Sequence, residues 1–174
     1  MARLKMLEKS EVDPIARELF QKQEDSSGRV INLFKVLAHS PKIVRDWSRL
    51  GTTLLRKGKL ADDLRELAII RVGELANSAY ELTAHRAIGM NAGLSQEQVN
   101  DVANWQDSSH YNEIERAVLK YTDEVAIDIR ASDETFAELQ KHFSSQEIVE
   151  LTVSIGYYGM VVRVLEPLQV DLER

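Results

Sequence analysis

An all-α fold is predicted by three features of this 174-residue sequence. Apolar residues recur at steps of three and four through most of the chain, which places them on one face of a helix. Proline and capping residues mark helix starts at intervals. No stretch alternates apolar and polar residues for long enough to suggest a strand. We therefore expect a compact bundle of about eight or nine helices.

The first third of the chain is expected to begin with a loosely held arm at residues 1–12, which are polar and lack a clear period. Asp13 and Pro14 then form a helix start, with Asp as the N-cap and Pro at the first helical position. The helices expected in this part lie at residues 15–23, 30–39 and 42–56.

The rest of the chain contains three Ser-x-x-Glu/Gln sequences, which are typical of capping boxes at helix starts. They begin at Ser78, Ser95 and Ser144. Gly93 is expected to end a helix as its C′ residue. The helices expected here lie at residues 62–76, 79–92, 96–104, 111–129, 135–142 and 148–165. Gly156 and Gly159 lie within the last of them, where we expect another backbone to approach closely, and Pro167 is expected to kink or end it.

Composition favours a single soluble domain over residues 1–174. The net charge of −6 and the pI near 5.3 argue against nucleic-acid binding through phosphates. The sequence has no run of about 20 apolar residues and no signal-peptide pattern, so we expect a cytoplasmic protein without a membrane span. The chain has no cysteine, which excludes disulfides, thiolate metal sites and thiol redox chemistry carried by its own residues.

Four residues in two adjoining helical segments offer the most chemistry. Ser78, Glu81 and His85 lie at offsets that share one helix face, and Glu66 lies on the preceding helix. His85 could act as a general acid or base, and a contact with Glu66 would compensate the cost of burying that carboxylate. The alternative is a structural histidine bonded to Glu81 or to a backbone carbonyl.

Other constellations are less favoured. Ser78 and Glu81 are explained by a capping box alone, and a Ser–His–acid triad lacks the expected G-x-S-x-G context. No H-E-x-x-H or E-x-x-H spacing includes these residues, so we expect no metal. The remaining histidines are expected to be structural or solvated: His39, His110 and His142. Tyr157 and Tyr158 of the last helix are expected to be packing and interface residues rather than acids, and one of them could line the pocket.

The stretch LRELAIIRVGELANSAYELTAHRAIGMNAGLS, residues 64–95, closely resembles the core of the carboxymuconolactone decarboxylase and alkylhydroperoxidase D-like (AhpD-like) superfamily. The flanks VINLFKVLAHSP and GYYGMVVRVLEP resemble the same family. The resemblance implies an all-α AhpD-like fold built around a central helical hairpin. It also implies homo-oligomers, often trimers or hexamers, with the active site at that hairpin near a subunit interface.

In the peroxidase branch of this family, a glutamate is followed by a C-x-x-C pair and then by a histidine. The glutamate and histidine correspond to Glu66 and His85, whereas the two cysteine positions hold Ser78 and Glu81. Peroxidase activity is therefore disfavoured, because the thiolate is the nucleophile in that reaction.

The decarboxylase branch lacks the dithiol and is the more similar one in that respect. The resemblance implies that His85 is the general acid/base, that Glu66 orients it and that Tyr80 donates a hydrogen bond to the substrate. Ser78, Glu81, Arg71 and Arg86 are candidates for the substrate pocket. We expect a lyase without cofactor that acts on a small organic acid or lactone. The competing hypothesis is an oligomer without catalysis or with a ligand-binding role.

Overall fold

The computed structural model describes residues 2–173, which form α-helices and two short turns of other helix types, without a strand in that range. This confirms the predicted all-α fold. The chain divides into two compact units, Met1–Arg56 with Val164–Arg174, and Lys57–Arg163. Each unit is described by itself. The expectation of a single domain over the whole chain stays a prediction.

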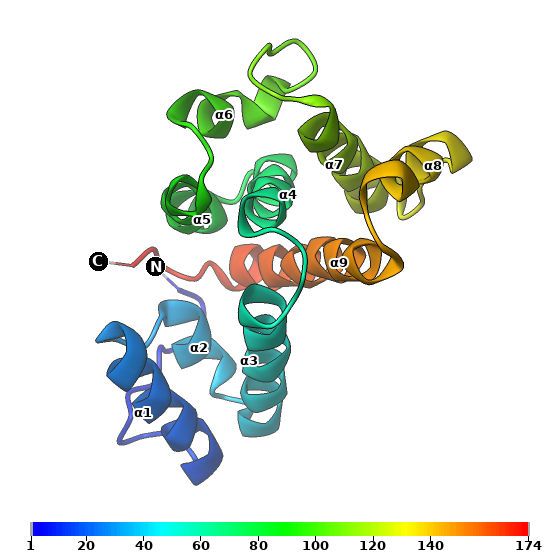
Figure 1. The fold of residues 1–174 in the computed structure, drawn as a ribbon. Coiled ribbons are helices and arrows are strands. Elements are labelled where there is room, and N and C mark those ends of the chain that lie inside the picture. The colour runs from blue at the N-terminus through cyan, green and yellow to red at the C-terminus, as the bar shows by residue number, and fades with distance from the viewer. Residues whose placement is uncertain (1, 174) are drawn as a thin grey trace. The chain divides into compact units, whose positions relative to one another are not determined.

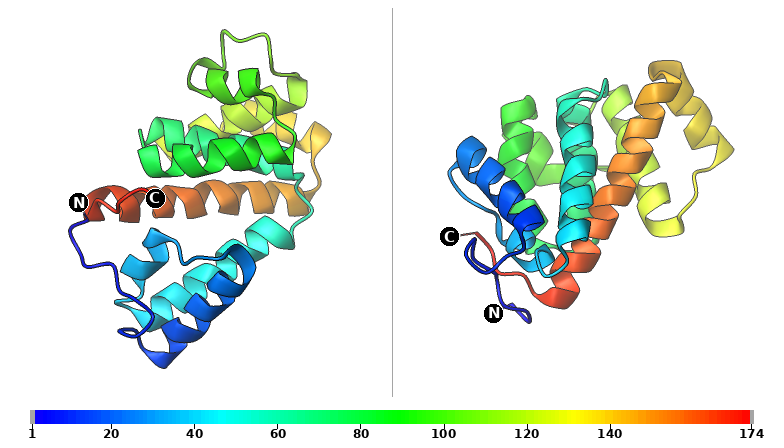
Figure 2. Two further views of the ribbon diagram at one scale, coloured as in Figure 1. Left: turned by 90° about the vertical axis from the view of Figure 1, so that its left-hand side faces the viewer. Right: turned by 90° about the horizontal axis from the view of Figure 1, so that it is seen from below.

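The first unit contains α1 (Pro14–Ser27), α2 (Asn32–Leu37) and α3 (Pro41–Arg56). The Asp13 side chain accepts a hydrogen bond from the Ile15 N–H and caps α1 as predicted. The helix continues past the expected end at residue 23, because the polar stretch that follows still forms helical hydrogen bonds up to Gly28, which has a φ of 76°. Helices α1 and α3 lie side by side (Figure 2).

The N-terminal residues make backbone hydrogen bonds within this unit, although the sequence suggested a loosely held arm. The Arg3 N–H donates to the Leu168 carbonyl at 2.9 Å, and the Leu7 N–H donates to the Lys35 carbonyl at 3.2 Å. These bonds attach residues 3–7 at two points.

The second unit is organised around the hairpin of α4 and α5, which lie side by side (Figure 1). Helix α7 packs against α4, and α8 packs against α7. The helices that begin in this unit are α4 (Asp62–Leu75), α5 (Ala79–Ala92), α6 (Gln96–Asp101), the 3₁₀ turn η1 (Val102–Asn104), α7 (Glu113–Asp123), the π turn η2 (Glu124–Asp128), α8 (Asp133–His142) and α9 (Ser145–Leu168). The hairpin predicted from the sequence is therefore the centre of this unit.

Close packing between α4 and α5 depends on Gly89. A Cβ atom added there would lie 2.9 Å from the Cδ1 atom of Ile70 and 3.6 Å from the Cβ atom of Glu66. An added Cβ at Gly156, where the sequence suggested a close approach, would meet nothing within 4 Å. The close contact predicted for the last helix is thus wrong for Gly156, and an added Cβ at Gly159 would meet only the Arg163 side chain, at 3.2 Å. Gly89 of α5 is a glycine that a close contact does require.

The end of α7 also differs from the sequence expectation. The α-helix changes to the π turn η2 at Glu124, and Ile129 adopts a left-handed conformation with a φ of 60°. A π turn contains more residues than an α turn, so it rotates the following side chains away from the predicted apolar face. Ile129, the last residue of the helix predicted at 111–129, is 74% exposed.

Helix α9 is long and apolar enough to cross a membrane by length and composition alone, with a mean hydropathy of 1.5 in its most apolar window. Half of that window is buried within the protein, as in a core helix of a soluble fold. Pro167 lies in the last turn, and the helix ends at Leu168. We therefore interpret α9 as a core helix.

Candidate functional site

The turn between α4 and α5 is set by Asn77, which has a φ of 50°. The Ser78 N–H donates to the Gly73 carbonyl at 2.9 Å, and the Asn77 N–H donates to the Glu74 carbonyl at 3.0 Å. These two bonds form a Schellman motif with Asn77 at the C′ position. Only three residues, 76–78, separate the helices, so the two helices that carry the candidate site are held rigidly together.

The capping box predicted at Ser78 is wrong. Ser78 is the N-cap of α5, but its side chain makes no capping hydrogen bond. The physical reason is a competing partner, because the Ser78 N–H that Glu81 would have to reach already donates to Gly73. The boxes predicted at Ser95 and Ser144 are present, with reciprocal bonds to Gln98 and Glu147.

Glu66 of α4 and His85 of α5 form a buried pair. The Glu66 Oε2 atom lies 2.6 Å from the His85 Nδ1 atom, and the two residues are 1% and 8% exposed. A neutral imidazole that donates its Nδ1 proton to a carboxylate is fixed in one tautomer and one orientation. Nε2 is then the nitrogen that can exchange a proton with another group.

Glu81 lies one helical turn before His85 and approaches the other ring nitrogen. Its Oε2 atom lies 3.5 Å from Nε2, and the residue is 4% exposed. The imidazole is thus placed between two buried carboxylates, one at each nitrogen. Because the two carboxylates face different ring nitrogens, the three side chains do not converge on one point as metal ligands would.

Two tyrosines of α9 complete the surroundings of His85. The Tyr158 ring contacts the imidazole edge-on, with 4.8 Å between the ring centroids, and Tyr157 packs edge-on against Tyr158. Burial raises the pKa of both phenols, and the negative charges of Glu66 and Glu81 raise the pKa of Tyr158 further. Both hydroxyls therefore remain neutral and able to donate a hydrogen bond.

Arg65 is a member of this cluster that the sequence analysis missed. It is 5% exposed, and its Nε atom lies 3.9 Å from the Glu66 Oε1 atom without a hydrogen-bond partner among the described residues. Its NH2 group contacts Asp62 at 2.9 Å. The sequence indicates only that Arg65 directly precedes Glu66, and this position does not predict that the Arg65 side chain is buried.

Arg71 and Arg86, which were predicted to line the pocket, bind other carboxylates. Arg71 donates to Asp123 at 2.5 and 3.1 Å and to the carbonyls of Val102 and Ala103. Arg86 donates to Glu74 at 2.5 Å from a side chain that is 42% exposed. Both guanidinium groups are therefore engaged in ion pairs outside the Glu66–His85 cluster.

Tyr80 is buried at the start of α5, at 8% exposure. It lies five residues before His85, an offset that rotates it by about 140° around the helix axis. The structure therefore places Tyr80 on a different face of α5 from His85, whereas Tyr158 contacts the imidazole directly.

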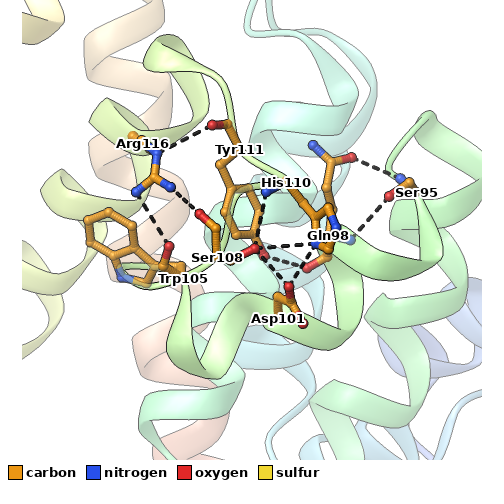
Figure 3. A network of polar contacts seen from close by, with 8 residues as sticks. All are labelled: Ser95, Gln98, Asp101, Trp105, Ser108, His110, Tyr111 and Arg116. Atoms are coloured by element: carbon orange, nitrogen blue, oxygen red, sulfur yellow. Dashed lines mark hydrogen bonds and ion pairs between the residues drawn. The ribbon is translucent and has the colours of Figure 1, made fainter.

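A second Ser–His–Asp group lies between α6 and α7 (Figure 3). His110 Nδ1 lies 2.8 Å from Asp101 and 3.3 Å from Ser108, and the Ser108 hydroxyl donates to Asp101 at 2.7 Å. In a hydrolase triad the serine contacts the opposite ring nitrogen from the aspartate. Here both contact the same nitrogen, so the group holds the loop in place, as expected for His110.

The described residues include one possible metal-ligand group, formed by Glu113, Glu138 and His142 at the surface. Lys141 already contacts Glu138 at 2.5 Å, and His142 contacts the same carboxylate at 3.2 Å. These ion pairs account for the positions of the Glu138 and His142 side chains without a metal.

Comparison with known proteins gives a family match. Residues 41–124 match the Carboxymuconolactone decarboxylase family (CMD). This range includes α3, α4, α5, α6 and α7, and with them the candidate site.

Solved structures share the fold over most of the chain. An uncharacterized peroxidase-related protein from Ralstonia eutropha with an alkylhydroperoxidase AhpD core is 20% identical, has a TM-score of 0.87, and is matched over 99% of this chain and 92% of its own. A protein of unknown function from Agrobacterium tumefaciens is 26% identical, with a TM-score of 0.73 over 79% and 95%. The debrominase Bmp8, in complex with 2,3,4-tribromopyrrole, is 18% identical, with a TM-score of 0.81 over 99% and 94%.

Proposed function

We propose, from the match of residues 41–124 to the Carboxymuconolactone decarboxylase family and from the shared AhpD-like fold, that this chain is a member of that superfamily without the cysteine pair and acts as an acid–base enzyme without cofactor. The reaction is of the lyase type, and the substrate is a small organic acid or a lactone. Thiol peroxidase chemistry is not proposed, because the chain has no cysteine to supply the nucleophile.

The observation that supports this proposal is the buried 2.6 Å contact between Glu66 and His85. Glu66 holds the imidazole by Nδ1 and stabilises the positive charge that develops when Nε2 gains a proton. The contact is shielded from water, so its electrostatic effect is stronger than at the surface.

In a decarboxylation, the bond between carbon and the carboxylate breaks, and its electron pair stays on the substrate carbon as CO₂ leaves. Nε2 of His85 first takes a proton from water, which leaves hydroxide, and His85 then donates this proton to that carbon and returns to the neutral imidazole held by Glu66. Arg65 is a buried cation whose Nε atom lies 3.9 Å from Glu66, and it is the group we assign to an oxyanion of the substrate. Tyr158 lies against the imidazole and can donate a further hydrogen bond.

The test is turnover of a panel of lactones and β-keto acids by His85→Ala and Glu66→Gln. We expect both variants to lose about 10²–10⁴-fold in kcat, the usual contribution of general acid–base catalysis. His110→Ala is the matched control, because it removes a histidine that also contacts a carboxylate but lies in the α6–α7 loop. Circular dichroism checks that each variant is folded. Equal turnover by wild type and His85→Ala would exclude the catalytic role.

The competing hypothesis of a ligand-binding protein predicts a different result from the same panel. Under this hypothesis the protein binds a compound of the panel without converting it, and His85→Ala changes only the affinity for that compound. A result of this kind would replace the enzyme proposal.

We also propose that the chain forms a homo-oligomer, a trimer or hexamer as the family resemblance implies. The support in the structure is an apolar face of α9, on which Val149, Val153 and Met160 are 60%, 38% and 40% exposed. Apolar side chains at such spacing on one helix face are typical of interfaces. Light scattering at micromolar concentration measures the mass, and a monomer would exclude the proposal.

A further inference from the structure

We propose that Arg65 and Glu66 form a subsite for one hydroxyl group of the ligand, so that the substrate is a hydroxylated organic acid or lactone. The Arg65 Nε–H group donates a hydrogen bond to the hydroxyl oxygen, and the Glu66 Oε1 atom accepts one from the hydroxyl hydrogen. Both atoms belong to neighbouring residues of α4. The inference rests on the proposed function and narrows its substrate class.

The two atoms are buried and have no hydrogen-bond partner among the described residues. Arg65 is 5% exposed and Glu66 is 1% exposed. Nε lies 3.9 Å from Oε1, which is too long for a direct hydrogen bond, so the two atoms do not satisfy each other. Buried polar atoms of folded proteins nearly always have a partner. We therefore expect a polar group of a bound molecule at this point.

Other contacts hold both side chains in place. The second carboxylate oxygen of Glu66, Oε2, lies 2.6 Å from the His85 Nδ1 atom. The Nη2 atom of Arg65 lies 2.9 Å from the Asp62 carboxylate. Each side chain is thus anchored by one atom, and the atom without a partner keeps a fixed position. A fixed donor beside a fixed acceptor is a preorganised site, which binds its ligand without first having to order its own groups.

A hydroxyl group suits such a pair, because one oxygen both accepts and donates a hydrogen bond. Two hydrogen bonds of about 2.8 Å that meet at about 90–110° on one oxygen place their outer atoms roughly 4.0–4.6 Å apart, close to the 3.9 Å found here. A carboxylate or ketone oxygen only accepts, so it would face Oε1 without a hydrogen between them. An ammonium group only donates, and it would meet the Arg65 guanidinium with a like charge.

The subsite is compatible with the oxyanion that we assign to Arg65. A guanidinium has five N–H donors, so a bond from Nε leaves others for a carboxylate next to the hydroxyl group. The Tyr158 phenol lies within reach of both charges, because burial raises its pKa, the charge of Glu66 raises it further and the charge of Arg65 opposes the rise. Tyr158 also contacts the His85 imidazole. A hydroxylated acid in the subsite therefore lies beside the imidazole.

The test measures the affinity of the full chain for matched pairs of acids by isothermal titration calorimetry. The pairs are lactate and propionate, 3-hydroxybutyrate and butyrate, and mandelate and phenylacetate, which differ by one hydroxyl group. We expect the hydroxylated member to bind about 10-fold more tightly in at least one pair, because its analogue leaves two buried polar atoms unpaired. Equal affinities within every pair, or no binding of any acid, would overturn the assignment to a substrate hydroxyl.

Arg65→Lys keeps the positive charge and removes the Nε–H donor. We expect this variant to lose the preference for the hydroxylated acid and to keep its affinity for the other member of the pair, because the charge that binds the carboxylate remains. Arg86→Lys is the matched control, because the Arg86 Nε atom is also buried without a hydrogen-bond partner among the described residues, but the Glu74 Oε1 atom beside this arginine already accepts a bond at 2.5 Å. It should keep the preference. An unchanged preference in folded Arg65→Lys would contradict the inference.

A water molecule offers the same donor and acceptor as a hydroxyl group. A crystal structure of the wild type soaked with the preferred hydroxy acid distinguishes the two sources and does not depend on the folding of a variant. A ligand oxygen within about 3.2 Å of both Nε and Oε1 supports the inference. A water molecule that stays at this point, or a ligand oxygen that binds neither atom, overturns it.

Failure of this inference can be told from failure of the proposed function. Loss of turnover in His85→Ala together with equal affinities within every pair would keep the enzyme and exclude the hydroxyl subsite. A preference for the hydroxylated acids without turnover of any compound would keep the subsite and exclude the enzyme.

Discussion

Replacing Arg71 by methionine should destabilise the protein without acting on the candidate site. Arg71 is buried, and its guanidinium binds the Asp123 carboxylate through two nitrogens. It also donates to the carbonyls of Val102 and Ala103 at 3.0 and 3.1 Å, which joins α4 to η1 and α7. Methionine keeps most of the apolar stem and removes all these bonds.

The size of this loss in stability depends on the groups that lose their partner, which are the Asp123 carboxylate and two backbone carbonyls. Removing one partner of a buried ion pair costs about 3–5 kcal/mol, because the other charge stays buried without compensation. The Asp123 side chain is 16% exposed and still accepts a hydrogen bond from the indole N–H of Trp105 at 3.0 Å. The cost of breaking the ion pair alone should therefore lie near the lower end of this range. Each carbonyl that loses its donor adds about 1 kcal/mol. We therefore expect a loss of about 3–5 kcal/mol in the free energy of unfolding, or roughly 6–20 °C in Tm.

Urea unfolding followed by circular dichroism measures this loss. Arg86→Met is the matched control, because its pair with Glu74 involves an arginine that is 42% exposed, and it should cost below about 1 kcal/mol. Arg71→Met combined with Asp123→Asn should recover part of the loss, because the uncompensated charge is gone. A loss below about 1 kcal/mol for Arg71→Met would refute the reasoning. Loss of substrate affinity in the folded variant would instead support the pocket role suggested by the sequence.

Two further predictions concern packing and pH. Gly89→Ala should be less stable than Gly156→Ala by about 1–3 kcal/mol in urea unfolding, because the new Cβ at position 89 meets Ile70, whereas the new Cβ at position 156 meets open space. Equal stability of the two variants would contradict the close packing of α4 and α5. Burial raises the pKa of Glu150, but the Leu60 N–H and other donors lower it more, so the net pKa lies below 4.5. Glu150→Gln should therefore lose stability at neutral pH, and its difference from wild type should shrink as acid titration protonates the wild-type carboxylate; a constant difference between pH 7 and pH 3 would exclude this linkage.

The helices and the central pair could be predicted from the sequence because both depend on local spacing. Apolar residues at steps of three and four identified α4 and α5, and the family resemblance related Glu66 to His85 across the turn. The fold class is confirmed, whereas the catalytic roles stay predictions. The structure adds the distance between the two side chains and shows that both are buried.

The features that were missed depend on contacts that local patterns do not determine. Arg71 pairs with Asp123, which lies 52 positions further along the chain, so no local pattern favours this partner over a substrate. Ser78 fits a capping box by spacing, but a backbone bond formed by the preceding helix uses the N–H that the box requires. Ile129 follows the helical period of α7 until a π turn changes the rotation per residue.

The short turn at Asn77 also has a consequence for how the protein folds. Glu66 and His85 are only 19 residues apart in the chain, and the loop that brings them together is three residues long. Loop closure over so few residues costs little entropy, and local contacts of this kind form early in folding. The candidate site can thus assemble together with the hairpin that supports it, before the longer-range contacts of α9 are made.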